Sequence, residues 1–372
     1  MKYLVLGAGR MAVGVIYDLI QYGNAEKIFV TDIDPKALTK IKNRFKDKRV
    51  SVFQFGADQK EEICKLMAQV DGALSAVPYD YNFELTKWAI DNHCHLVDLG
   101  GNNTMVEKQF SLDDKAQKKG VGIVPDCGLA PGMVSVVAMD LLERLPEAET
   151  LQIRVGGLPV NPKTPLNYML VFSVHGLTNE YIEPSVIIKN GKITEIPSMT
   201  GVENLSFSKP FDQLEAFYTS GGTSTLPMTF KGRLKNLDYK TIRYSGHCKL
   251  FKAMMDLGFT DEKMFTRGLT RRQIFEQLLI EPLTYDSEDV VLIRLTAKDQ
   301  QKQLVYETIE YGDKNNALTA MMRTTAFPAA IILEMLVDGR VKDHGVLRQE
   351  VAVPSGAFMA ELRKRDICFN IY

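Results

Sequence analysis

Short apolar runs alternate with longer amphipathic stretches through the first 130 residues of the chain. The runs have the length of buried strands, and the stretches between them repeat their apolar positions at helical spacing. Strands are expected at residues 3–6, 28–30, 50–53, 72–77, 95–97 and 121–124, with helices such as 35–46, 61–69 and 81–92 between them. Because strands and helices alternate, the pattern predicts an α/β fold with a doubly wound parallel sheet.

The pattern changes after Pro146, which stops an expected helix over residues 134–144. Further strands are expected at residues 151–155, 186–189, 192–196, 214–218, 239–244, 290–296 and 304–310, with helices near 249–257 and 271–279. Residues 168–172 form an apolar run. The pair Asn190-Gly191 separates two of these runs and is typical of a tight hairpin. This region is predicted to be an α+β domain with a mixed or antiparallel sheet, for substrate binding and oligomerisation.

A glycine-rich turn follows the first expected strand. Gly7, Gly9 and Ala12 stand between an apolar run and an amphipathic helix. This spacing is typical of a turn that seats a dinucleotide pyrophosphate on a helix N-terminus, so Arg10 and Met11 are also expected to contact the cofactor. A tight turn that uses glycine for structure alone is the alternative. The first domain is therefore predicted to be a Rossmann domain.

Asp32 indicates which nicotinamide cofactor binds. It ends the second strand about 20 residues beyond the turn, where a carboxylate accepts hydrogen bonds from the adenosine ribose. The following residues, Ile33, Asp34 and Pro35, offer no cation for a 2′-phosphate, which favours NAD over NADP. Further cofactor contacts are expected near the carboxyl ends of the strands, at Asp58, Ala76, Val77, Pro78, Asp98 and Gly100.

The end of the chain is expected to return to the first domain. Residues 317–336 form a long apolar stretch that predicts a helix, followed by a helix at 355–365 and a strand at 367–371. Residues 1–130 and 317–372 are therefore assigned to the NAD-binding domain. Residues 131–316 are assigned to the substrate-binding and catalytic domain.

Composition narrows the function classes. The chain has 372 residues, of which 45% are hydrophobic and 24% charged, as in soluble proteins of two domains. A net charge of −1 gives no reason to expect nucleic acid or an anionic membrane as a partner, and no apolar run is expected to span a bilayer. No signal peptide is expected either. The five cysteines form no CxxC pair, which favours reduced thiols, a cytoplasmic location and no bound metal.

Several motifs along the chain resemble one known family. They are VDLGG at residues 97–101, PDCGLAPG at 125–132, VGGLP at 155–159, PLNY at 165–168, LEAF at 214–217, TSGGTSTL at 219–226, YKTIRYSGH at 239–247 and AMMRTTA at 320–326. Together they resemble the saccharopine dehydrogenase-like family, and most of all its lysine 6-dehydrogenase branch. Ala130 and Val155 stand where saccharopine dehydrogenase carries an Asp and a Cys, and both look like the lysine 6-dehydrogenase pattern.

The resemblance implies an NAD-dependent oxidoreductase that oxidises the ε-amine of L-lysine in lysine degradation. The products would be ammonia and 2-aminoadipate 6-semialdehyde, which cyclises to piperideine-6-carboxylate. A small amino acid is then the ligand, and a homo-oligomer is expected. Two alternatives stay open: a related enzyme that acts on a secondary amine of the saccharopine, carboxynorspermidine or opine type, and an NAD-binding sensor without catalysis.

Such chemistry needs a cation for the substrate carboxylate and groups that move protons. Arg243 is the candidate for the carboxylate, because guanidinium binds carboxylate in a bidentate fork, although a structural ion pair is equally compatible. Asp98 and Asp126 end parallel strands where ligands collect, and both are candidates for proton transfer. Helix capping or loop hydrogen bonding is the alternative for both aspartates.

Tyr168 and His247 complete the predicted catalytic set. Tyr168 is a possible donor to the amine or to water, and His247 is a possible base that is as often a packed or capping residue. Glu215 could recognise an ammonium group, but an exposed strand carboxylate is the favoured interpretation. Within the family motifs, further substrate contacts are assigned to Gly128, Gly157, Thr219 and Ser220.

Overall fold

The computed structural model describes residues 1–266 and 268–372, which form two compact units. Unit 1 contains Met1–Asp140 and Met322–Cys368, and unit 2 contains Leu141–Met321 and Phe369–Tyr372. The expected boundaries at 130 and 316 differ from these because two helices run across the divisions, α7 (Val134–Arg144) and α12 (Ala320–Val337). The last four residues belong to unit 2 since strand β18 (Asn370–Ile371) pairs with β16 (Gln303–Tyr311).

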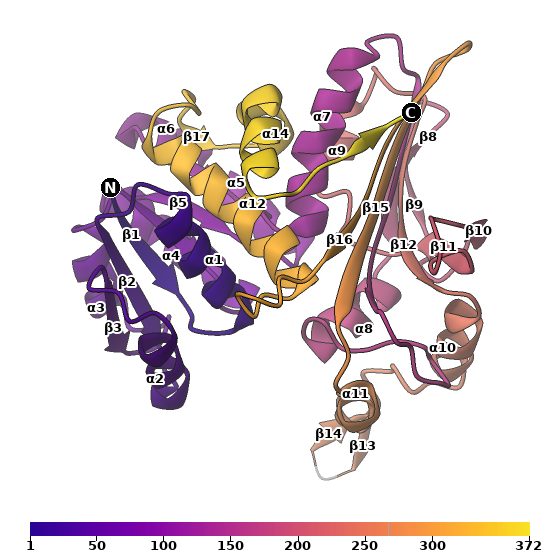
Figure 1. Cartoon of the computed structure of the whole chain (residues 1–372), viewed down its shortest axis with the longest axis horizontal. Coiled ribbons are helices and arrows are strands. Elements are labelled where there is room, and N and C mark those ends of the chain that lie inside the picture. The colour runs from indigo at the N-terminus through magenta and orange to yellow at the C-terminus, as the bar shows by residue number, and fades with distance from the viewer. Residues whose placement is uncertain (267) are drawn as a thin grey trace. The chain divides into compact units, whose positions relative to one another are not determined.

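Unit 1 is built on a parallel sheet of seven strands in the order β17-β6-β5-β4-β1-β2-β3 (Figure 1). Its strands are β1 (Lys2–Leu6), β2 (Lys27–Asp32), β3 (Val50–Gln54), β4 (Gly72–Ser75), β5 (His95–Asp98), β6 (Gly122–Val124) and β17 (Gly345–Val346). All neighbouring pairs are parallel, which confirms the predicted doubly wound sheet. The edge strand β17 comes from the C-terminal segment and was not predicted, because two residues give no periodic signal.

The helices of unit 1 connect the strands and cover the sheet. They include α1 (Arg10–Gln21), α2 (Pro35–Arg44), α3 (Lys60–Met67), α4 (Asn82–Asp91), α5 (Asn103–Phe110), α6 (Asp113–Lys119), α13 (Gln349–Ala352) and α14 (Ser355–Lys364). Local sequence explains where they begin. Asp34 caps α2 by accepting a hydrogen bond from the Lys36 N–H at 2.8 Å, and Pro35 occupies the first helical turn, where no N–H is needed.

Helix α12 packs in the interior. A Cβ at Gly14 of α1 would lie 2.7 Å from the Ala326 Cβ, so glycine allows α1 to lie directly against α12 (Figure 1). By length and composition α12 could cross a membrane, contrary to the expectation that no apolar run is long enough. However, 83% of its most apolar stretch is buried, as in the core helix of a soluble protein.

Unit 2 contains a nine-stranded mixed sheet, as predicted. Its strands are β7 (Thr150–Pro159), β8 (Ser185–Lys189), β9 (Lys192–Ile196), β10 (Glu203–Leu205), β11 (Leu214–Tyr218), β12 (Asn236–Tyr244), β15 (Asp289–Lys298), β16 and β18. Among the described residues of this sheet, β7 and β12 pair in parallel and all other neighbouring strands pair antiparallel. Asn190 and Gly191 have φ of 52° and 75°, which fits the hairpin predicted between β8 and β9.

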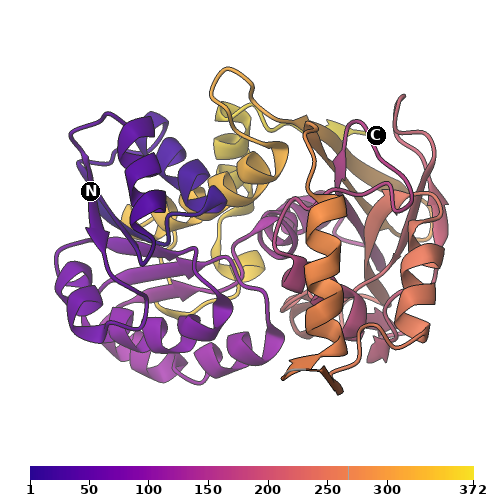
Figure 2. The same cartoon turned by 90° about the horizontal axis from the view of Figure 1, so that it is seen from below.

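The apolar segment 168–172 is a loop. Its apolar side chains pack in one core with α8 (Val174–Ile182), α10 (His247–Asp256) and α11 (Arg271–Leu283), and unit 2 also contains α9 (Leu226–Phe230). Helices α8, α10 and α11 pack against β11 in one core that includes Tyr181, Phe217, Phe251 and Phe275. Figure 2 shows α10 and α11, coloured salmon and orange, on the same side of the unit 2 strands.

Candidate functional site

The glycine turn of unit 1 lies where β1 and β4 run side by side. Gly7 has φ of +100°, and a Cβ there would lie 2.8 Å from the Ala76 carbonyl oxygen and 3.3 Å from a Val77 methyl carbon. Gly9 caps α1, has nothing within 4 Å of the position of a Cβ, and is exposed. The first turn of α1 therefore offers N–H groups to an anion without a side chain in the way, as a dinucleotide pyrophosphate requires.

Asp32 is tied to this turn. Its carboxylate accepts hydrogen bonds from the Ala8 N–H and the Asp34 N–H, each at 2.7 Å, so it holds the turn and the start of α2. Each carboxylate oxygen can accept a second bond, which leaves the half-buried Asp32 able to bind a ribose. A Cβ at Gly56 would touch both the Asp58 carboxylate and Ile33, so the loop with Asp58 adjoins the loop after Asp32.

Asp98 is placed differently from the prediction. It is fully buried, and its carboxylate accepts bonds from the Gly100 N–H at 2.8 Å, the Asp126 N–H at 3.2 Å and the Gln109 amide at 2.8 Å. Burial raises its pKa. With no exposed surface and three protein donors, Asp98 holds two loops together, so its assignment to proton transfer and direct cofactor contact is corrected to a structural role.

Asp126 adopts φ of 60° in the loop after β6, and its side chain lies so close to Gly100 that a Cβ there would collide with it. Its carbonyl accepts a bond from the Gln349 amide at 3.0 Å. Gly128 follows in the same loop and precedes the segment Leu129–Met133, in which Ala130, Pro131 and Gly132 have non-helical backbone angles. The structure thus brings Asp98, Gly100 and Asp126 together at the carboxyl ends of β5 and β6.

In unit 2 the predicted Arg243 lies in β12 and is 2% exposed. Its Nε–H donates to the Tyr181 hydroxyl at 2.8 Å, and Nη1 donates to the Ile242 carbonyl at 2.9 Å. The guanidinium lies over the Tyr168 ring, 4.7 Å from its centroid. Nη2 has no hydrogen-bond partner in the part of the chain that the structure describes, so one edge of the guanidinium is open to a ligand carboxylate.

His247 is held on both ring nitrogens. Nδ1 lies 2.9 Å from the Leu166 carbonyl, which can only accept, so Nδ1 carries the proton and Nε2 accepts from the Tyr181 hydroxyl at 3.0 Å. Burial, with Arg243 nearby, lowers its pKa to about 3. An imidazole this resistant to protonation cannot act as a base near neutral pH, and the predicted catalytic role is corrected: His247 orients Tyr181, which orients Arg243.

Tyr168 and Glu180 face the same guanidinium. The Tyr168 side chain is fully buried and its hydroxyl makes no hydrogen bond of normal geometry within the described chain, while burial raises its pKa to about 12. Glu180 of α8 is half-buried, and burial raises its pKa to about 7 in spite of the opposing effect of Arg243. Sequence reasoning missed Glu180, although the helix start at Ser173 was recognisable and the PLNY motif lies just before it.

The other substrate contacts predicted in unit 2 have partners within the protein. Thr219 bonds the Thr241 hydroxyl at 2.7 Å, and the Ser220 N–H donates to the Glu180 carbonyl at 2.9 Å. Gly157 faces Met321, whose methyl carbon would lie 2.5 Å from a Cβ. The assignment of these three residues to substrate binding stays a prediction.

Glu215 is not the exposed strand carboxylate favoured by the sequence. It is 7% exposed and accepts bonds from the Gly246 N–H at 2.9 Å and the Cys248 N–H at 2.6 Å. A carboxylate at this place stabilises the N-terminus of α10. That helix begins with His247, so Glu215 helps to fix the histidine that holds Tyr181.

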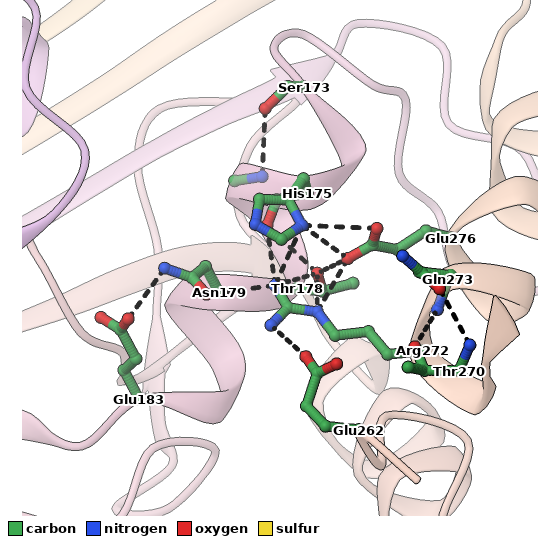
Figure 3. Close-up of polar contacts among 11 residues, drawn as sticks. Ser173, His175, Thr178, Asn179, Glu183, Glu262, Thr270, Arg272, Gln273 and Glu276 are labelled. Carbon is green, nitrogen blue, oxygen red and sulfur yellow. Dashed lines mark hydrogen bonds and ion pairs between the residues drawn. The ribbon is translucent and has the colours of Figure 1, made fainter. Parts of the chain in front are cut away.

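Helix α8, which carries Glu180 and Tyr181, is anchored by Arg272 of α11 (Figure 3). Arg272 donates to the Thr178 hydroxyl at 3.0 Å, to the Asn179 amide oxygen at 3.1 Å and to Glu276 at 2.8 Å. A capping box between Thr270 and Gln273 fixes the start of α11. Arg272 therefore anchors the helix from which Glu180 and Tyr181 project.

The described residues, 1–266 and 268–372, contain no group of three or more His, Cys, Asp or Glu side chains placed to hold a metal ion. All five cysteines are free thiols, three of them buried.

Two family models match the chain. The saccharopine dehydrogenase C-terminal domain matches residues 128–367, and the saccharopine dehydrogenase NADP binding domain matches residues 3–124. The second match and the geometry around Gly7 and Gly9 together support a nicotinamide dinucleotide as cofactor.

Similar proteins include the mitochondrial alpha-aminoadipic semialdehyde synthase of Rattus norvegicus, 21% identical over 99% of this chain and 47% of that protein. Another is the saccharopine dehydrogenase [NADP(+), L-glutamate-forming] of Pyricularia oryzae, 23% identical over 64% of this chain and 56% of that protein. The chain spans about half the length of these curated relatives.

Two solved structures have a similar fold. The apo saccharopine dehydrogenase (L-Glu forming) from Saccharomyces cerevisiae has a TM-score of 0.82 at 17% identity and covers 100% of this chain and 99% of that chain. The homospermidine synthase from Legionella pneumophila in complex with NAD has a TM-score of 0.72 at 12% identity and covers 100% and 91%.

Proposed function

We propose, because the chain belongs to the saccharopine dehydrogenase family, that it is an NAD-dependent oxidoreductase that deaminates the ε-amine of L-lysine. The reaction consumes lysine, NAD and water. It gives 2-aminoadipate 6-semialdehyde, ammonia, NADH and a proton, and the aldehyde then condenses with its own α-amine, with loss of water, to form piperideine-6-carboxylate.

Arg243 is the observation that carries this proposal. A buried guanidinium is costly unless its charge is matched, and Arg243 keeps one N–H edge without a protein partner in the described chain. The α-carboxylate of an amino acid fits such an edge as a bidentate acceptor. Polyamines carry no carboxylate, so Arg243 favours an amino acid over a polyamine as substrate.

A bound nicotinamide would accept the hydride that leaves C6 of lysine, and Gly7, Gly9 and Asp32 would hold the dinucleotide. Asp32 supports NAD, since it would repel a 2′-phosphate and the neighbouring Ile33 and Asp34 supply no cation. Arg243 would bind the carboxylate end of the substrate, with Tyr181 and His247 fixing its orientation. Asp126 remains the candidate for proton transfer.

A secondary amine is the second candidate, because the relatives named above include enzymes called saccharopine dehydrogenase. Ala130 and Val155, which resemble the lysine 6-dehydrogenase pattern, favour lysine. The test is NADH formation from NAD with lysine, compared with saccharopine and carboxynorspermidine at equal concentration. Turnover of lysine above the others supports the proposal, and turnover of another amine without lysine contradicts it. The cytoplasmic location and the homo-oligomer remain predictions.

A further inference from the structure

We infer that Glu180 is a specificity-determining residue that binds the α-ammonium group of an amino-acid substrate, beside the carboxylate bound by Arg243. This inference rests on the proposed function, because it names a second contact in the same site. It depends on the arrangement of side chains contributed by α8 and β12 within unit 2. The two elements are joined by the hydrogen bond from the Arg243 Nε–H of β12 to the Tyr181 hydroxyl of α8, at 2.8 Å.

The first step is that Glu180 has no protein partner for its charge. Its carboxylate makes no hydrogen bond or ion pair with any residue in 1–266 or 268–372, although the rest of α8 is densely bonded. The preceding Asn179 bonds Glu183 and Arg272, and the following Tyr181 bonds Arg243 and His247. A half-buried carboxylate that stays unpartnered among satisfied neighbours is destabilising, and such groups are retained where a ligand completes them.

The second step is that Glu180 faces Arg243 without pairing with it. The guanidinium lowers the pKa of Glu180, so the two charges lie within electrostatic reach, but no ion pair joins them. Tyr168, Tyr181 and Tyr239 also lie within electrostatic reach of Glu180, because burial raises the pKa of each phenol and the Glu180 charge raises it further. None of these tyrosines supplies a positive charge. A ligand cation would therefore give Glu180 the ion pair that neither Arg243 nor these tyrosines form with it.

The third step is the chemistry of a ligand that satisfies both groups. Arg243 presents an open N–H edge, and the buried Tyr168 hydroxyl beside it lacks a hydrogen bond of normal geometry in the described chain. A ligand that satisfies both residues needs a carboxylate for Arg243 and an ammonium group for Glu180, close together on one molecule. An α-amino acid in its zwitterionic form has this arrangement. The uncharged methylene chain of lysine would then extend away from this pair of charges.

The pKa of about 7 that burial gives Glu180 is consistent with this role, since an ammonium group would favour the ionised carboxylate and lower that value. A side chain that only stabilised the position of α8 would be hydrogen-bonded to a neighbouring element. Thr178 and Asn179 are bonded in this way to Arg272 of α11 (Figure 3). Glu180 makes no such bond.

The test measures binding of unreactive probes in the presence of NADH, by isothermal titration calorimetry. L-norleucine carries both α groups, and hexanoate carries only the carboxylate. Glu180→Gln should weaken the binding of norleucine by about 10- to 100-fold and leave the affinity for hexanoate unchanged, because only the contact with the ammonium group is lost. Arg243→Gln should weaken both probes. Glu180→Asp, which keeps the charge, should recover part of the norleucine affinity.

The inference would be overturned if Glu180→Gln lost affinity for both probes equally, or if it lost no affinity for norleucine. It would also be overturned if the unaltered protein did not bind norleucine. Unchanged circular dichroism spectra of both variants, together with retained hexanoate binding by Glu180→Gln, show that unit 2 is folded. If lysine is not oxidised but norleucine and hexanoate separate as stated, the proposed reaction is wrong and the amino-acid site stands. If lysine is oxidised and Glu180→Gln leaves its KM unchanged, the reaction stands and the inference is wrong.

Discussion

Replacing Glu180 with Gln should make the ligand-free protein more stable at pH 8. Burial raises the pKa of this carboxyl from its ordinary value of 4.5 to about 7, which means that the folded protein opposes its ionisation. A difference of this size corresponds to a cost of about 3 kcal/mol when the group is fully ionised. Because Glu180 is half-buried and the new amide also lacks partners, the expected net gain is about 1 to 2 kcal/mol.

The pH dependence identifies the cause of the gain. The folded state binds the Glu180 proton more tightly than the unfolded chain does, so the penalty is absent below a pH of about 4.5 and complete above about 7. The variant should therefore gain stability over the unaltered protein as the pH rises through this window. Arg243 and the facing tyrosines do not change charge there, and other carboxyls contribute equally to both proteins.

Urea denaturation of the ligand-free proteins at pH 5 and pH 8, followed by circular dichroism, measures this difference. Glu195→Gln is the matched control, because Glu195 is an exposed carboxylate on β9 and its loss should change stability little at either pH. A Glu180→Gln protein that is less stable than the parent at pH 8 would refute the reasoning. That result would mean that the carboxylate has a stabilising partner.

Three further results are expected. Tyr181→Phe removes the hydroxyl between Arg243 and His247 and should raise the KM for lysine about 10-fold, with a smaller change in kcat. The control Tyr244→Phe loses only a bond to the Pro159 carbonyl and should leave the KM unchanged. An unchanged KM in Tyr181→Phe would show that His247 and Tyr181 do not orient Arg243. Gly9→Ala should weaken NADH binding in a fluorescence titration without loss of stability. Gly7→Ala should weaken binding and also destabilise the fold by about 1 to 3 kcal/mol, because of the positive φ at Gly7 and the nearby Ala76 carbonyl. Equal stability of the two variants would contradict this description of the turn. Asp32→Ala should reduce NAD affinity by about 10-fold and NADP affinity less, and an equal loss of both would remove the argument for NAD.

The first unit was largely predictable because its signals are local. Gly7, Gly9 and Asp32 lie in one strand-turn-helix-strand stretch, and the periodicity of the following runs gives the parallel strands directly. The edge strand β17 escaped prediction because it consists of Gly345 and Val346 alone and depends on pairing with a distant part of the chain.

The candidate site in unit 2 was predicted only in part, because burial and pairing there are set by residues far apart in sequence. Arg243 and Tyr168 were found through their motifs, and the structure brings them together. His247 resembled a base until the Leu166 carbonyl and the Tyr181 hydroxyl occupied both nitrogens. Glu180 could not be found from sequence, since its distinguishing feature is a missing partner within a folded neighbourhood.

The most direct test of the account is the fate of the hydrogen on C6 of lysine. The protein is incubated with NAD and L-lysine deuterated at C6, and the reduced cofactor is examined by mass spectrometry and NMR. Deuterium at C4 of the nicotinamide, together with release of ammonia, is the predicted result. Formation of no reduced cofactor from lysine, under conditions where saccharopine or another secondary amine reduces NAD, would contradict the account.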